Sequence, residues 1–183
     1  MGVCDSSSEP KNKNSTSSRK SANKRTKTKM PKLVQADLDE RDEILKRGRK
    51  KELQQMINDY NEGINDYSFG QNKTLLLQAC MICPNPDVVD MIMEKSADID
   101  KEEYQTGNTA IFLSAVDLKV EFVRRLLKYN PNLQHRNHAG QNIFDFLNFQ
   151  LFEQREKIGR EMTDEERQKY QEIENMLNSY VEN

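Results

Sequence analysis

Two stretches of the sequence follow one pattern: NKTLLLQAC at residues 72–80 and GNTAIFLSA at residues 107–115. The threonines that they share, Thr74 and Thr109, lie 35 residues apart. A weaker third copy, GQNIFDFL at residues 140–147, follows the second copy at a distance of 33 residues. A recurring spacing of about 33 residues is typical of repeat proteins, in which each unit packs against its neighbours. The three copies therefore predict a solenoid.

Each copy also predicts a pair of short helices. Thr74 begins a first helix of about eight residues, since its hydroxyl can accept a hydrogen bond from a free amide of the first turn. The segment DVVDMIM at residues 87–93 forms the second helix, and SADID at residues 96–100 ends the unit. The second copy continues in the same way with EFVRRLL at residues 121–127. The expected fold class is therefore all-α.

These elements resemble the ankyrin repeat, whose pattern runs Thr-Pro-Leu-His-x-Ala, then Val-Val-x-Leu-Leu, then Gly-Ala-Asp. The resemblance covers roughly residues 39–147. It implies a short ankyrin-type helical repeat solenoid that binds proteins through its loops, or fingers, and its inner helices. The sequence departs from the pattern at Leu77 and Phe112, which replace the histidine. Tetratricopeptide and HEAT pairs, the helical alternatives, lack the threonine start and the glycine-rich finger.

The predicted domain organisation follows from this resemblance. A disordered basic tail with the lipidation motif occupies residues 1–32, because its Ser, Asn, Thr, Lys and Arg side chains offer almost nothing to bury. An ankyrin-repeat domain occupies residues 33–183. Its predicted parts are a cap at about 39–65 and repeats at about 66–99, 100–132 and 133–180, the last with a helical insertion at 148–160.

A capping helix is expected at the C-terminus. Thr163 and Glu166 form a capping-box sequence, with the threonine at the cap and the glutamate three residues later. Apolar residues then recur at helical spacing, namely Tyr170, Ile173, Met176, Leu177 and Tyr180. We interpret this segment as the outer helix of the last repeat, which closes the stack with its polar face. A short coiled-coil contact is the alternative interpretation.

The first six residues, MGVCDS, match the sequence that N-myristoyl transferase modifies once Met1 is removed and Gly2 exposes its amine. Cys4 lies two residues further on, where a membrane-held thiol can take a palmitate. One myristoyl chain holds a protein to a bilayer only marginally, so stable anchoring needs a second chain or a polybasic patch. We therefore predict lipidation at Gly2 and Cys4.

A basic run without acidic residues follows and supplies such a patch. The net charge of −2 combines +7 in residues 1–32 with −9 in the remainder. The residues expected to face an anionic membrane are Lys11, Lys13, Arg19, Lys20, Lys24, Arg25, Lys27, Lys29 and Lys32. The same run also fits a nuclear address or a nucleic-acid tether. The acidic body, by contrast, argues against nucleic acid as its own ligand.

Neither a metal site nor an active site is expected. Cys80 and Cys83, together with His135 and His138, suggest a zinc ligand set by residue type. However, the thiols and the imidazoles fall at opposite ends of the first helix of a repeat, roughly 12 Å apart, whereas a zinc–ligand bond is about 2 Å long. The sequence also lacks a glycine-rich phosphate loop and a nucleophile elbow. We therefore predict no enzyme activity, no cofactor and no small-molecule substrate.

The expected function is protein binding at a membrane. The predicted contact residues lie on the fingers: Tyr67, Phe69, Glu103, Tyr104, His135, Arg136 and His138. Alternatively, the aromatic ones fold back over the first helices. Since no stretch of about 18 apolar residues is present, we expect a lipid-anchored peripheral adaptor at the cytoplasmic face of a membrane, or otherwise in the cytoplasm, with a protein partner. The alternative function is a structural subunit of a large assembly, whose basic tail binds an acidic surface such as a microtubule or nucleic acid.

Overall fold

The structure is a computed structural model that describes residues 35–59, 63–67, 73–153, 159 and 161–182. The chain divides into two units, Met1–Pro31 and Lys32–Asn183. The first unit lies outside the described residues, and with it Gly2, Cys4 and the basic residues up to Lys29. The disorder predicted for residues 1–32 therefore stays a prediction.

All the regular structure in the described residues is helical, and no strand is present among them, which confirms the predicted all-α class. The α-helices are α1 (Gln35–Arg47), α2 (Lys50–Asp59), α3 (Leu75–Ile82), α4 (Asp87–Met93), α5 (Ala110–Val116), α6 (Val120–Leu127), α7 (Ile143–Asn148) and α9 (Asp164–Val181). A π-helical segment, η1 (Phe149–Glu153), extends α7.

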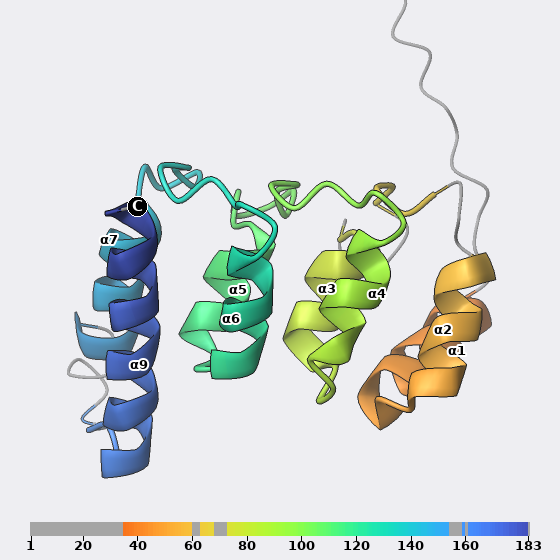
Figure 1. Cartoon of the computed structure of the whole chain (residues 1–183), viewed down its shortest axis with the longest axis horizontal. Helices are drawn as coiled ribbons and strands as arrows, with labels where there is room; N and C mark the ends of the chain where they lie inside the picture. Colours follow the sequence, from red (N-terminus) through yellow and green to blue (C-terminus); the bar gives the residue numbers. More distant parts are fainter. Residues whose placement is uncertain (1–34, 60–62, 68–72, 154–158, 160, 183) are drawn as a thin grey trace, which may run out of the picture. The chain divides into compact units, whose positions relative to one another are not determined.

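The helices of the second unit form two rows (Figure 1). In one row α1, α3, α5 and α7 contact each other in that order, and in the other row α2, α4, α6 and α9 do so. Within the first three pairs the two helices also contact each other. The loops that join one pair to the next lie at one end of the helices, and the turns within the first three pairs lie at the other end (Figure 1). Each pair thus packs chiefly against the pairs beside it.

Burial explains the difference between the two rows. In α3, the side chains of Leu75, Leu76 and Ala79 are buried, as their inward positions in the repeat predict. In α5, every residue from 110 to 115 is buried, so this helix is enclosed on nearly all sides. The second-row helix α6, in contrast, buries only one face, formed by Phe122, Val123 and Leu126. The first row is therefore the centre of the core.

The three sequence copies each start a helix at the corresponding residue. Thr74 caps α3, because its hydroxyl accepts a hydrogen bond from the N–H of Leu77 at 3.3 Å. This confirms the predicted cap. Asn142 caps α7 through a capping box with Asp145. Thr109 occupies the same position before α5, yet its buried hydroxyl has no hydrogen-bond partner in the part of the chain that is described.

The backbone conformation recurs along with the sequence. Gly107 and Gly140 have φ angles of +71° and +76°. Ser96 and Asn130, which follow α4 and α6, have φ angles of +59° and +54°. A left-handed residue after a helix lets the chain turn sharply while the last carbonyls remain hydrogen-bonded. The chain therefore bends in the same way at corresponding places in successive units.

The C-terminal helix begins as predicted. Thr163 accepts a hydrogen bond from the N–H of Glu166, and Glu166 accepts one from the N–H of Thr163, which completes the capping box. Ile173 and Leu177 of α9 are buried, and α9 contacts α6. This helix thus occupies the end of the second row.

Two boundaries differ from the sequence prediction. The helix α1 begins at Gln35, earlier than the predicted cap, and it contacts both α2 and α3. The predicted insertion at 148–160 starts as a direct continuation of α7 into η1 rather than as a separate helix. Residues 154–158 and 160 of this insertion lie outside the described residues.

We expect the two threonine caps to respond differently to an isosteric substitution. Thr74→Val removes the hydrogen bond to Leu77 and should lower the free energy of unfolding by about 1 kcal/mol. Thr109→Val removes a buried hydroxyl without a partner and should leave that free energy unchanged or raise it by up to about 1 kcal/mol. Urea unfolding followed by circular dichroism compares the variants. Equal losses of stability would contradict this distinction between the caps.

Candidate functional site

The candidate binding surface is the end of the stack where loops join successive helix pairs, here called the finger edge. Its three fingers comprise residues 63–74, 98–109 and 131–142, of which 68–72 are not described. Figure 1 shows these loops together at one end of the helices. Of the predicted contact residues, Phe69 lies outside the described part and the other six lie on the fingers, namely Tyr67, Glu103, Tyr104, His135, Arg136 and His138.

Hydrogen bonds join the first finger to the second. The hydroxyl of Tyr67 donates to the carbonyl oxygen of Glu102 at 2.9 Å, and Asn65 Oδ1 accepts from the N–H of Asp98 at 2.6 Å. Lys101 places its Nζ 5.1 Å from the centre of the Tyr67 ring, a cation–π contact. Tyr67 is therefore only partly exposed and is engaged by the neighbouring finger.

The third finger is joined to the second through its two histidines. His135 Nε2 donates to the carbonyl oxygen of Gly107 at 2.7 Å, and His138 Nδ1 donates to that of Gln105 at 3.1 Å. A Cβ atom at Gly107 would lie 2.6 Å from the ring of His138, so this close approach requires glycine. The second finger is thus held from both sides.

A buried ion pair fixes the base of the second finger. Lys73 Nζ lies 3.0 Å from Glu103 Oε1, and the two residues are only 3% and 7% exposed. Glu103 also accepts a hydrogen bond from the hydroxyl of Thr106, and its backbone N–H donates to the carbonyl oxygen of Asn108 at 2.8 Å. The carboxylate of Glu103, a predicted contact residue, is therefore enclosed with Lys73 and not exposed at the surface.

Three of the predicted contact residues are exposed on the finger edge. Tyr104 is 67% exposed, the largest fraction among the exposed large hydrophobic side chains of the described residues. His138 and Arg136 are also exposed, and Arg136 lies 3.6 Å from Asp145 of α7. His135 is mostly buried, so a partner can reach Tyr104, Arg136 and His138 more easily.

Glu102 is a finger-edge residue that the sequence prediction missed. One of its carboxylate oxygens lies 3.8 Å from His135 Nδ1 and the other lies 3.7 Å from His138 Nε2. Although the two glutamates are adjacent in the sequence, Glu102 is partly exposed whereas Glu103 is buried. The sequence alone does not indicate which of these two adjacent glutamates faces outward.

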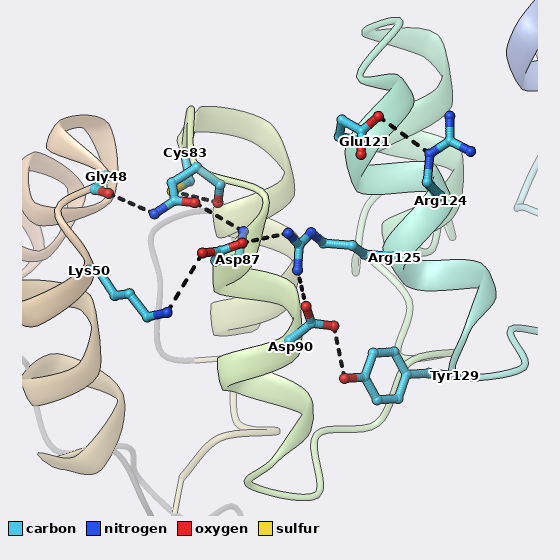
Figure 2. Close-up of polar contacts among 10 residues, drawn as sticks. Gly48, Lys50, Cys83, Asp87, Asp90, Glu121, Arg124, Arg125 and Tyr129 are labelled. Atoms are coloured by element: carbon cyan, nitrogen blue, oxygen red, sulfur yellow. Dashed lines mark hydrogen bonds and ion pairs between the residues drawn. The ribbon is translucent and has the colours of Figure 1, made fainter.

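A second polar cluster joins the second-row helices α2, α4 and α6 (Figure 2). Arg125 forms ion pairs with Asp87 and Asp90, and Tyr129 donates its hydroxyl to Asp90 at 2.9 Å. Lys50 of α2 lies 3.8 Å from Asp87. Burial and the hydrogen bond to Asp90 raise the pKa of Tyr129. Because these charged side chains pair with one another across neighbouring helices, we interpret the cluster as a contact that stabilises the stack.

Cys80 is a small buried side chain, as predicted. Burial raises the pKa of its thiol to about 12. Lys119 donates from Nζ to the carbonyl oxygens of Cys80 and Met81, both at 2.6 Å. These bonds give hydrogen-bond donors to carbonyl groups of the last turn of α3. A thiol that stays protonated and enclosed is a poor nucleophile and a poor metal ligand.

The described residues contain no group of three or more His, Cys, Asp or Glu side chains placed to hold a metal ion. No helix in the same part of the chain is both long and apolar enough to cross a membrane. Among the grooves between described helices, one of about 440 Å³ lies beside α1 and α2 and one of about 460 Å³ lies beside α6 and α9. Both are open to the surface and have mixed polar and apolar linings.

No protein-family model matches the sequence, and no curated protein matches it. The candidate site is therefore defined by its own geometry. The finger edge presents an exposed aromatic ring, a half-exposed carboxylate and an exposed imidazole on loops that hydrogen bonds hold in place. Such a rigid set of aromatic and polar groups suits contact with another protein.

We expect the buried ion pair to be necessary for the stability of the stack. Lys73→Met leaves the carboxylate of Glu103 buried without its counter-charge and should lower the free energy of unfolding by about 3 kcal/mol or more. Adding Glu103→Gln removes the uncompensated charge and should recover more than half of that loss. Urea unfolding of both variants measures the effect. A loss below about 1 kcal/mol in Lys73→Met would contradict it.

Stability should also fall at alkaline pH because of Cys80. Its pKa is raised to about 12 in the folded chain from an ordinary value near 9, so the fold favours the protonated thiol. The resulting stabilisation is complete below about pH 9 and is lost above it, with a slope approaching about 1.4 kcal/mol per pH unit. Unfolding free energies measured from pH 7 to 10 test this. The slope should be smaller in Cys80→Ala, and an unchanged slope would rule Cys80 out as its source.

Proposed function

We propose that this chain is a protein-binding adaptor, built as a short ankyrin-type stack and held at the cytoplasmic face of a membrane by its first residues. The proposal that the chain binds proteins rests on the structure of the finger edge. There, Tyr104 is exposed on a loop that is tied to both neighbouring fingers and to the buried Lys73–Glu103 pair. An exposed aromatic side chain on a rigid loop loses little entropy on binding, which favours interface contact.

The ankyrin-type assignment is supported by features that recur near the period of the sequence repeat. Thr74, Thr109 and Asn142 each precede a first-row helix, and Gly107 and Gly140 share one left-handed conformation. Two rows of short helices, joined by fingers at one end, fit the same assignment. A short stack offers a small recognition surface, so each partner contact should be of modest affinity.

Membrane attachment would compensate for that modest affinity. The motif around Gly2, the nearby Cys4 and the nine basic residues up to Lys32 supply the two membrane signals that stable anchoring requires. Holding a weak binding site and its partner on the same surface raises their effective concentration. In this proposal the finger edge determines which partner is bound, and the tail localises the chain to the membrane. Phosphorylation of the serines and threonines of the tail would reduce its positive charge and favour release.

Metabolic labelling with a clickable myristate analogue tests the membrane part. Wild-type protein should carry the label and be recovered with membranes, whereas Gly2→Ala should be unlabelled and recovered largely in the soluble fraction. Cys4→Ser serves as the graded control: it should keep the label but be retained more weakly, since a single myristoyl chain binds marginally.

Two results would contradict the membrane anchor. One is wild-type protein without label, and the other is Gly2→Ala that stays with membranes to the same extent. Co-sedimentation with microtubules, compared with flotation on vesicles that contain anionic lipid, then separates the adaptor from a subunit whose basic tail binds an acidic polymer. Binding to microtubules alone, in a chain that carries no label, would support that second function.

A further inference from the structure

We propose that the finger edge binds a protein segment that carries arginine or lysine, with the Tyr104 ring as the face on which the cation lies and the Glu102 carboxylate as its counter-charge. This inference rests on the proposed function, since it gives the chemistry of the partner that the adaptor would recognise. Its basis is the combination of an exposed ring, a fixed backbone and a carboxylate of the same finger.

The Tyr104 ring is presented from a backbone that cannot easily move. The N–H of Glu103 donates to the carbonyl oxygen of Asn108 at 2.8 Å, and the N–H of Gly107 donates to that of Glu103 at 2.9 Å. These bonds close a tight loop with Tyr104 near its tip. Because Tyr104 is 67% exposed on such a loop, a partner can contact its side chain without the loop first having to become ordered.

The first finger already shows the proposed contact within the chain. Lys101 places its ammonium group 5.1 Å from the centre of the Tyr67 ring, within the range of a cation–π interaction. Tyr67 is thus occupied by a lysine of the neighbouring finger. Among the contacts found in the described residues, none places a cation or a second ring on Tyr104. The Tyr104 ring on the second finger carries no such contact and is therefore open to a cation from outside.

The charges on the finger edge favour a cationic partner. On the three fingers, the described carboxylates other than that of the buried Glu103 belong to Asp66, Asp98, Asp100 and Glu102. On the same fingers, the described Lys and Arg side chains other than the buried Lys73 are Lys101 and Arg136. Lys101 lies over the Tyr67 ring, and Arg136 lies 3.6 Å from Asp145. The edge is thus negative overall, and the body of the chain has a net charge of −9.

Glu102 gives this negative charge a defined position. It lies two residues before Tyr104, and its carboxylate is 46% exposed beside the rings of His135 and His138. An arginine suits the pair best, because its planar guanidinium can stack on an aromatic face and also bind a carboxylate. Lysine can make the same contacts as a point charge.

The test uses the full chain, labelled with ¹⁵N, and a ten-residue peptide that alternates glycine and arginine. The matched probe replaces each arginine with citrulline, which has the same shape and no charge. The arginine peptide should shift the amide signals of Tyr104 and Gln105, and the citrulline peptide should not. Tyr104→Ala should weaken binding about two- to fivefold, whereas Tyr104→Phe keeps the ring and should bind as wild type. Glu102→Gln should also weaken it.

Phe152→Ala is the control for loss of an exposed aromatic ring, since Phe152 lies on η1, away from the finger edge, and its removal should leave binding unchanged. Equal binding of the two peptides would overturn the inference. So would unchanged affinity in Tyr104→Ala, or shifts confined to the acidic helix α1. These outcomes are independent of the membrane anchor. If the chain carries the myristate label but Tyr104→Ala does not change the affinity for the arginine peptide, only this inference is refuted. If the chain carries no label but binds the arginine peptide at Tyr104, only the membrane anchor is refuted.

Discussion

The stack depends on one constraint: helices this short are unstable in water by themselves. The helices α3 to α6 contain only seven or eight residues each, which is below the length at which isolated helices form. Their stability must come from burial against neighbouring helices. The enclosure of α5 by its neighbours in both rows satisfies this requirement most fully. The exposed faces of the second row can then be polar without loss of the fold.

The same dependence on neighbours extends to the polar groups. On the finger edge, side chains of one finger bond to the backbone of the next, as His135 does with Gly107. Within the second row, Arg125 joins α6 to α4, and Lys119 of the loop before α6 satisfies the end of α3. Each of these bonds crosses from one helix pair to an adjacent pair. The polar contacts therefore follow the same nearest-neighbour order as the apolar ones.

Much of the helical arrangement could be predicted from local sequence patterns. The cap at Thr74, the second helix at Asp87–Met93 and the capping box at Thr163 depend on residues close together in the chain, so their patterns are visible in the sequence. The buried pair of Lys73 and Glu103 could not be predicted in this way. Its members are 30 residues apart, and both belong to types that usually remain in water.

The candidate site was predicted less completely for the same reason. The exposure of Tyr104 follows from its place near the tip of a finger. The partial burial of Tyr67 and His135, however, depends on groups supplied by the adjacent finger, which only the fold brings close. Phe69 and the lipidation residues Gly2 and Cys4 lie outside the described residues, so their roles remain predictions.

The ion pairs of the second row have a consequence for how such a chain can evolve. Arg125 binds Asp87 and Asp90 of the preceding pair, Lys50 approaches Asp87 from the other side, and Arg124 pairs with Glu172 of α9. The three second-row junctions of the described residues therefore use different charged pairs, although Asp87 takes part in two of them. A unit that was duplicated, deleted or exchanged with another would meet unmatched charges at its new borders. Charged residues on both sides of a junction would therefore have to change together for such a rearrangement to keep these ion pairs.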